Sequence, residues 1–299
     1  MKSVPIERLS LREDPQRAAE TFEAGPALPC IVTDAAAEWP ARGKWNMDFF
    51  ASRYGSNVGL APLGFGARAK IRGKATLLGA FIEHLGEPYD AIPGVWVGTD
   101  RNSAMLDDAL AWSFEWEPFR TDPGLFDDIS PFPLAIPNMT ANLSRDDYHA
   151  MESIHGRHFD AIYISRRNTV TPLHHDWHHS FGCLVQFHGR KKVVLFAPGG
   201  YQPVPEAGFD PENPDYDLYP AMRERLAYTD VLEPSEMLII PPDWLHYTRS
   251  EDHSITFSHN FFNRSNFDAH MRCVREDAAK SPEKTKLFDE LYAALAAAA

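Results

Sequence analysis

Cysteines, basic residues and long apolar runs are all scarce in this chain of 299 residues. Three cysteines, Cys30, Cys183 and Cys273, are too few and too scattered for a disulfide framework, and they show no CxxC spacing for zinc. No apolar run approaches the ~18 residues of a membrane span, and the opening MKSVPIERLS lacks the apolar region of a signal peptide. These absences favour a cytoplasmic protein that does not enter membranes.

The charge balance argues against nucleic acid as a partner. Lys and Arg number 29 against 42 Asp and Glu, which gives a formal net charge of −13 at pH 7. Neutralising phosphates requires a basic stripe, and this sequence contains none. An acidic surface tolerates a basic peptide, although net charge alone selects no partner.

The N-terminal part mixes short helices with short strands. Asp14-Pro15 caps a predicted helix that ends at Gly25. Further helices are predicted over 46–54 and 76–85, short strands over 30–33 and 95–97, and an exposed hairpin over 64–74.

Residues 99–159 are the least regular stretch, rich in Trp, Phe, Asp and Pro, with one predicted helix near 104–112. A long stretch of this kind is often a lid or a binding surface. An aromatic-rich wrap around the core is the other interpretation, and the sequence favours neither.

From Asp160 onward, one short strand follows another. Strands are predicted over 160–165, 169–176, 181–187, 191–197, 236–241 and 254–262, with an excursion at 198–230. Several strands with no helices between them predict an antiparallel sandwich or barrel. Two helices are predicted over 266–297, so we expect one domain over 1–265 and a helical tail over 266–299.

The strand pattern breaks between Thr171 and His179, where four of the 13 histidines lie. Because side chains alternate along a strand, His174 and Asp176 share one face. His246 is the best candidate for a third ligand, since it follows an apolar strand that can lie beside the first in a barrel. Two histidines and one carboxylate leave three positions open on a metal, as in non-haem Fe(II) oxygenases.

A surface pair without metal is the other explanation of an HxD motif. His175, His178 and His179 are interpreted as neighbours of the site or exposed side chains rather than ligands.

The next strand places Lys191 on the same face as Val193 and Leu195. A lysine there must reach solvent or meet an anion, because an unpaired buried ammonium is costly. We interpret it as an anchor for a ligand carboxylate. A surface salt bridge, with Lys192 facing inward instead, is the alternative. Ser258 and Asn260 share one face of the last strand and suit a pocket wall.

Together these motifs resemble the JmjC and cupin-like Fe(II)/2-oxoglutarate oxygenases, especially the factor-inhibiting-HIF asparaginyl hydroxylase branch. The shared features are the T-P-x-H-x-D order at 171–176, G-x-K at 189–191, the N-P-D-Y insert at 213–216, and a D-P-x-x-A helix leading to Thr33-Asp34. The resemblance implies a double-stranded β-helix, or jelly roll, and it covers most of the chain except 99–159.

The resemblance also implies roles for individual residues. His174, Asp176 and His246 would bind iron, Lys191 would hold the distal carboxylate of 2-oxoglutarate, and Thr171, Asn260 and Ser258 would assist. Simple alternation places Thr171 on the face opposite His174, unless Pro172 bends the strand.

Three departures from the family pattern limit what the resemblance implies about the substrate. The segment from Asp176 to Gly189 is longer than in the asparaginyl hydroxylase and looks more like the lysyl-hydroxylase branch of JmjC proteins. Pro234-Ser235-Glu236 replaces the usual Pro-Gly-Asp turn. No tyrosine matches the one expected at the cosubstrate, and Trp96 is placed in that neighbourhood.

The implied reaction is hydroxylation of a C–H bond of a protein side chain, peptide or small molecule, with release of succinate and carbon dioxide. The alternatives are a cupin with other metal chemistry, in which Lys191 is structural, and a regulatory or scaffold protein. In the resembling branch, C-terminal helices form a homodimer, so the tail is a candidate dimer interface.

Overall fold

The computed structural model describes residues 1–23, 25, 27–62, 73–97, 113–156, 158–199 and 209–298. The helix predicted near 104–112 and most of the hairpin predicted over 64–74 lie outside these residues.

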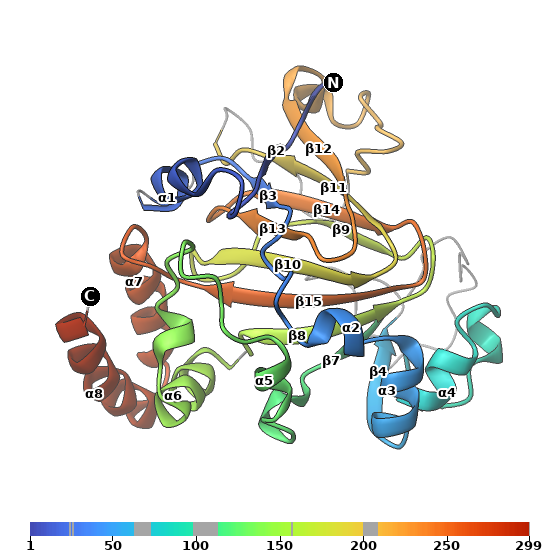
Figure 1. Cartoon of the computed structure of the whole chain (residues 1–299), viewed down its shortest axis with the longest axis horizontal. Coiled ribbons are helices and arrows are strands. Elements are labelled where there is room, and N and C mark those ends of the chain that lie inside the picture. Colours follow the sequence, from blue (N-terminus) through green and yellow to red (C-terminus); the bar gives the residue numbers. More distant parts are fainter. Residues whose placement is uncertain are drawn as a thin grey trace.

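Two β-sheets face each other and form the centre of the molecule (Figure 1). The minor sheet has the order β1 (Lys2–Pro5), β12 (Leu226–Leu232), β11 (Lys191–Phe196), β14 (Leu245–Ser250) and β9 (Val170–His174). The major sheet has the order β2 (Glu7–Leu9), β3 (Cys30–Val32), β13 (Met237–Ile240), β10 (Phe181–His188), β15 (Ser254–Phe261), β8 (Asp160–Ser165), β7 (Ser113–Trp116), β4 (Val58–Pro62), β5 (Gly73–Leu77) and β6 (Val95–Val97).

From β8 onward the chain crosses repeatedly between the two sheets, and only β11 and β12 are consecutive neighbours in one sheet. All pairings among these strands are antiparallel. This winding confirms the predicted double-stranded β-helix, whose facing sheets enclose a space lined by alternate side chains.

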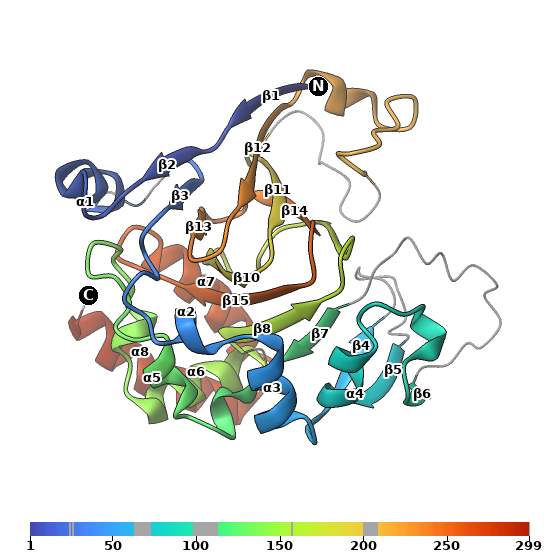
Figure 2. The ribbon, with the colours of Figure 1, turned by 45° about the vertical axis from the view of Figure 1, so that its right-hand side comes forward.

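The α-helices are α1 (Pro15–Glu23), α2 (Ala41–Lys44), α3 (Met47–Tyr54), α4 (Leu78–Glu83), α5 (Leu125–Asp128), α6 (Arg145–His155), α7 (Phe267–Ala278) and α8 (Pro282–Ala298). Helices α3, α5, α6 and α8 lie below β15 and β8 in the view of Figure 2. Short 3₁₀ turns lie at η1 (Tyr89–Ala91), η2 (Pro118–Arg120), η3 (Thr140–Asn142) and η4 (Pro220–Glu224). None of the described helices is both long enough and apolar enough to cross a membrane.

Several predicted boundaries were wrong. Residues 73–77 form β5, so the helix expected over 76–85 begins only at Leu78. β12 begins within the excursion expected at 198–230 and extends to Leu232, and its ladder to β11 outweighs the surrounding Pro-rich and Asp-rich composition. Helix α6 lies in the supposedly irregular stretch. Ser144 caps it by accepting a hydrogen bond from the Asp147 amide, and Gly156 ends it with φ 67°.

The C-terminal helices pack on α6 of their own chain. Phe267 and Met271 of α7 and Leu291 of α8 share one apolar cluster with Met151 and the rest of the buried face of α6. The apolar stripes are therefore buried within the chain, and a homodimer through this tail stays a prediction.

An aromatic cluster joins the N-terminal helices to the outer face of the major sheet. Trp45 is 2% exposed, and its ring centroid lies 5.0 Å from that of Phe187 on β10 and 5.5 Å from that of Phe50 on α3. Its Nε1–H donates to Asp128 Oδ2 at 2.9 Å, so the indole nitrogen is satisfied although buried. The indole thus links α3, α5 and the sheet.

Replacing Trp45 by Ala should lower the free energy of unfolding by about 3–5 kcal/mol, because it leaves a large cavity and removes the indole hydrogen bond to Asp128. Urea denaturation followed by circular dichroism measures this. Leu134→Ala, at a side chain that is 98% exposed, is the control and should change stability by less than about 0.5 kcal/mol. Equal effects of the two substitutions would contradict the assigned packing.

Candidate metal centre

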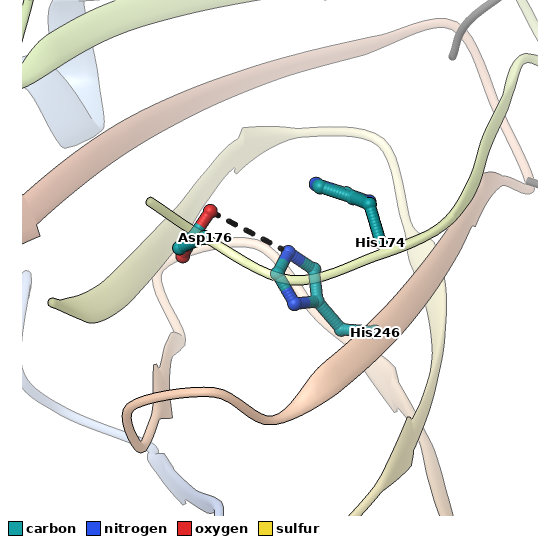
Figure 3. Close-up of side chains that lie close together, drawn as sticks. All are labelled: His174, Asp176 and His246. Atoms are coloured by element: carbon teal, nitrogen blue, oxygen red, sulfur yellow. Dashed lines mark ion pairs between the residues drawn. The ribbon is translucent and has the colours of Figure 1, made fainter. Parts of the chain in front are cut away.

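His174, Asp176 and His246 converge between the two sheets (Figure 3). One potential ligand atom of each lies within 4.8 Å of the others, and His246 Nε2 is 3.8 Å from Asp176 Oδ1. His174 and His246 are direct cross-strand partners on β9 and β14, with ring centroids 4.1 Å apart. The three residues that the sequence singled out are therefore brought together.

The strand beside β9 is not the one we expected. The apolar strand Met237–Ile240 pairs with β10 and β3 in the major sheet. The chain then turns at 241–244, where Asp243 has φ 63°, and crosses to the minor sheet as β14. His246 is the second residue of β14, so it reaches the site from a strand that the sequence pattern missed.

Backbone carbonyls fix the orientation of both imidazoles. His174 Nδ1–H donates to the Pro172 carbonyl at 2.8 Å, and His246 Nδ1–H donates to the Trp244 carbonyl at 3.0 Å. A carbonyl oxygen only accepts, so Nδ1 carries the proton in each ring. This leaves the lone pair of each Nε2 available to a metal ion.

The electrostatic surroundings also suit metal binding. Burial, and then the neighbouring His246, lower the pKa of His174 to about 4. The imidazole is therefore neutral near pH 7, as a metal ligand must be. Two imidazoles and one carboxylate form the donor set that non-haem Fe(II) prefers, so the residues present fit this ion.

Gly182 lets the Asp176 carboxylate approach β10. A Cβ atom at position 182 would lie 2.4 Å from Asp176 Oδ2, which is closer than atoms approach without a shift. The sequence reasoning missed this residue. A glycine inside an otherwise apolar strand was the available signal for a close approach.

Lys191 lies in the same pocket as the three candidate ligands. It is 6% exposed, and burial lowers the pKa of its ammonium to about 8. Lys191 therefore faces inward, and an anion beside it would raise its pKa and so favour the charged form further.

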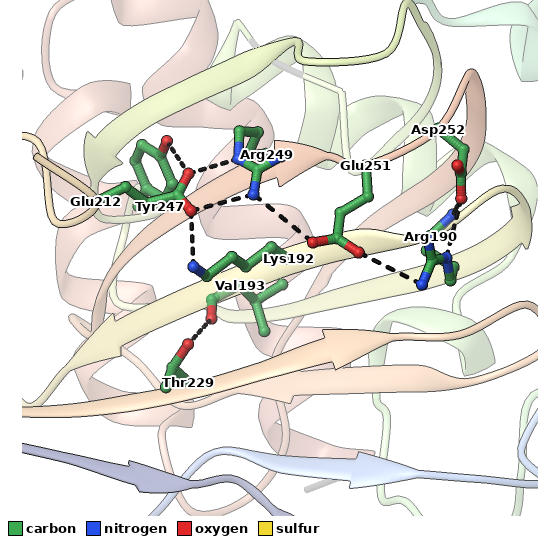
Figure 4. A network of polar contacts seen from close by, with 9 residues as sticks. All are labelled: Arg190, Lys192, Val193, Glu212, Thr229, Tyr247, Arg249, Glu251 and Asp252. Atoms are coloured by element: carbon green, nitrogen blue, oxygen red, sulfur yellow. Dashed lines mark hydrogen bonds and ion pairs between the residues drawn. The ribbon is translucent and has the colours of Figure 1, made fainter.

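Lys192 points to the opposite side of β11 (Figure 4). Its Nζ lies 2.7 Å from Glu212 Oε1, and Glu212 also accepts hydrogen bonds from Tyr247 and Arg249 of β14. Burial opposes ionisation of Glu212, but the bonds from Arg249, Lys192 and Tyr247 lower its pKa to about 2. This network fixes the insert that carries Glu212 onto the outer face of the strands bearing Lys191 and His246.

Thr171 also lines the pocket, contrary to simple alternation. On β14, His246 pairs with His174 of β9 and Thr248 pairs with Thr171. A step of two residues on β14 thus matches a step of three on β9, so β9 contains one extra residue. Such a bulge at Pro172-Leu173 brings Thr171 to the same face as His174.

The pocket has a volume of about 780 Å³ and includes Ser258 and Asn260 of β15 in its wall. Tyr163 on β8 also lines it, two positions along the strand from Ala161, the cross-strand partner of Ser258. Trp96 does not line this pocket. It is 43% exposed on β6 and packs against Tyr89, so its expected place near the cosubstrate was wrong.

The remaining histidines of the stretch lie around the site. His175 lines the pocket, while His178 and His179 form a left-handed turn with φ 54° and 52°. Helix α7 fixes this turn, because His270 Nδ1–H donates to the His178 carbonyl at 2.7 Å and Asn266 Nδ2–H donates to the His179 carbonyl at 2.8 Å. The C-terminal tail thus supports the segment that follows Asp176.

Comparisons with known proteins agree with this architecture. The family model described as a cupin-like domain matches residues 119–269, which is 151 of the 299 residues. The chain is 26% identical over 277 residues to lysine-specific demethylase JMJ30 of Arabidopsis thaliana, covering 86% of this chain and 57% of that protein. It is 25% identical over 262 residues to mouse 2-oxoglutarate and iron-dependent oxygenase JMJD4, covering 81% and 57%.

A third relative is human bifunctional peptidase and (3S)-lysyl hydroxylase JMJD7, which is 24% identical over 283 residues and covers 81% of this chain and 79% of that protein. The chain thus spans little more than half the length of JMJ30 and JMJD4. The family match and the site geometry agree, and the chain therefore belongs to the cupin-like family of JmjC proteins.

Proposed function

We propose that this protein is an Fe(II)- and 2-oxoglutarate-dependent oxygenase that hydroxylates a C–H bond of a protein or peptide. The observation that carries the proposal is the convergence of His174, Asp176 and His246 with the buried Lys191 in one pocket. A metal site alone would not require an inward lysine, whereas a dicarboxylate cosubstrate that bridges metal and ammonium does.

Each part of the pocket has a role in this proposal. His174 Nε2, His246 Nε2 and an Asp176 oxygen would hold the iron, which together with 2-oxoglutarate and dioxygen supplies the oxidising chemistry and yields succinate and carbon dioxide. Lys191 would bind the distal carboxylate, because an ammonium in a poorly solvated site gains most from an anionic partner.

Hydroxyl and amide groups complete the proposed cosubstrate site. Thr171, Ser258, Asn260 and Tyr163 line the same pocket and offer hydrogen-bond donors to the carboxylate oxygens. The pocket wall also includes the apolar side chains Leu173, Leu184 and Ile240. These exclude water from the reacting atoms and strengthen the polar contacts.

The substrate class rests on the relatives and on the size of the pocket. JMJ30 is named a lysine-specific demethylase and JMJD7 a lysyl hydroxylase, so both names point to protein side chains. The pocket of about 780 Å³ has room for a side chain beside the cosubstrate. The alternative is a small-molecule substrate. Turnover of peptides must therefore be compared with turnover of small molecules.

Four finer assignments stay part of this proposal. The T-P-x-H-x-D order at 171–176 and the N-P-D-Y insert at 213–216 support the factor-inhibiting-HIF asparaginyl hydroxylase branch. A cytoplasmic location rests on the composition. A separate helical tail over 266–299 rests on the two helices predicted from the sequence, and a homodimer through it rests on the branch resemblance.

Replacing His174 by Ala should abolish the visible charge-transfer band that Fe(II) and 2-oxoglutarate give anaerobically, because a ligand is lost. Succinate formation in air should fall by at least about 100-fold. His84→Ala, at the C-terminal end of α4 and outside the pocket lining, is the control and should leave both signals unchanged. A wild-type protein with neither signal would exclude the oxygenase and favour a cupin with other metal chemistry.

Replacing Lys191 by Met removes the charge but keeps an unbranched side chain only one heavy atom shorter. Affinity for 2-oxoglutarate should fall about 10- to 150-fold, the loss expected for a buried hydrogen bond to a charged group, while Mn(II) affinity stays the same. Isothermal titration of the metal-free protein with Mn(II) measures the first affinity to be compared. Titration of the Mn(II) protein with 2-oxoglutarate measures the second. Lys192→Met on the opposite face is the matched control. An equal loss in both variants would refute the assigned role of Lys191.

Replacing Gly182 by Ala should displace the Asp176 carboxylate and weaken Mn(II) binding about 10- to 100-fold. The measurement is metal titration with electron paramagnetic resonance, with circular dichroism to verify folding. Gly86→Ala is the control, since a Cβ at position 86 meets nothing within 4 Å. Unchanged metal affinity in a folded Gly182→Ala protein would argue against Asp176 as a ligand.

A further inference from the structure

A second cavity, of about 550 Å³, lies on the opposite face of the major sheet from the metal centre. Strand β15 contributes to both spaces. Ser258 and Asn260 line the metal pocket, whereas Phe257 and His259 line the second cavity. Strands β8 and β15 separate α5 and α6, on the side of the second cavity, from β11 and β14 (Figure 2). We refer to this space as the back cavity.

Aromatic rings from several segments form the walls of the back cavity. Phe119 lies with its ring centroid 4.7 Å from that of Phe126 and 5.7 Å from that of Phe257. The Trp39 and Phe132 centroids are 6.3 Å apart. Trp39 Nε1–H donates to the Pro131 carbonyl at 2.8 Å, so its polar edge is already satisfied. Such walls favour a flat apolar body that packs against rings.

The polar groups on the sheet side of the back cavity satisfy one another. His259 Nδ1–H donates to Asp160 Oδ1 at 2.8 Å, and the Tyr148 hydroxyl donates to the other Asp160 oxygen. The Asn138 amide donates to His259 Nε2 at 2.9 Å. The Asp160 carboxylate is thus held by two donors and is only 4% exposed. It needs no cation from a ligand.

Two arginines give the back cavity its charge preference. Arg120 in η2 and Arg145 at the start of α6 are exposed and line the cavity. Across the residues that the structure describes, neither forms an ion pair. With Asp160 already satisfied, these two guanidinium groups leave the cavity complementary to an anion.

We propose that the back cavity binds a small aromatic carboxylate. The ring lies among Trp39, Phe119 and Phe132, and the carboxylate reaches Arg120 and Arg145. The volume is in the usual range of ~300–1,000 Å³ for small-molecule sites, which are mostly apolar with a few placed polar groups. This binding is independent of the metal and of the oxygenase reaction.

Isothermal titration with naphthalene-2-carboxylate tests the proposal on the full chain. Arg120→Gln and Arg145→Gln should each weaken binding about three- to fivefold, as expected for exposed ion pairs. The neutral naphthalene-2-carboxamide should bind more weakly than the carboxylate to the wild type and equally to both variants. Arg272→Gln, an exposed arginine on α7, is the matched control and should change nothing.

Lys191→Ala distinguishes binding in the two cavities, because a carboxylate can also enter the metal pocket. Binding that persists in Lys191→Ala and weakens in the arginine variants supports the back cavity. No binding to the wild type, loss only in Lys191→Ala, or equal affinity for carboxylate and carboxamide would overturn the proposal. Tighter binding of decanoate than of the naphthoate would overturn its aromatic assignment.

Discussion

The pairing of β9 with β14 is the interaction on which the metal centre depends. It places His174 directly opposite His246, although 72 residues separate them along the chain. The same pairing contains the extra residue on β9 that turns Thr171 toward the pocket. Each imidazole then donates to a carbonyl two residues earlier in its own chain segment, so local backbone geometry fixes the tautomers. A slip of this register by one residue would move His246 to the other face of its strand and separate the ligands.

Elements outside the β-helix hold that register and its surroundings in place. On the outer face, Glu212 connects β11 and β14 through Lys192, Tyr247 and Arg249. On the side of the tail, α7 binds the carbonyls of the turn that follows Asp176. The tail is packed on α6, so a helix from the middle of the chain supports the metal centre indirectly. The charged network around Glu212 thus lies on the outer face of β11 and β14, whereas Lys191 is buried in the pocket.

The sequence predicted the alternating strands and the candidate ligands, because a period of two and an HxD motif are local patterns. It did not predict β12 or β14, since the first lies in Pro-rich surroundings and the second follows directly after a turn. The place of Thr171 depends on a bulge, and the need for Gly182 depends on how closely Asp176 approaches β10. Both depend on tertiary contacts, and the only local signal was the glycine within an otherwise apolar strand. Trp96 was misplaced for the same reason, because strand order across the major sheet puts β6 at its edge.

A crystal structure of the protein with Mn(II) and 2-oxoglutarate under anaerobic conditions tests the central claim most directly. The anomalous signal of manganese should lie between His174 Nε2, His246 Nε2 and the Asp176 carboxylate. The 2-oxo acid end of 2-oxoglutarate should chelate the ion, and its distal carboxylate should contact the Lys191 ammonium. A metal ion bound elsewhere, or a distal carboxylate that does not contact Lys191, would contradict the account.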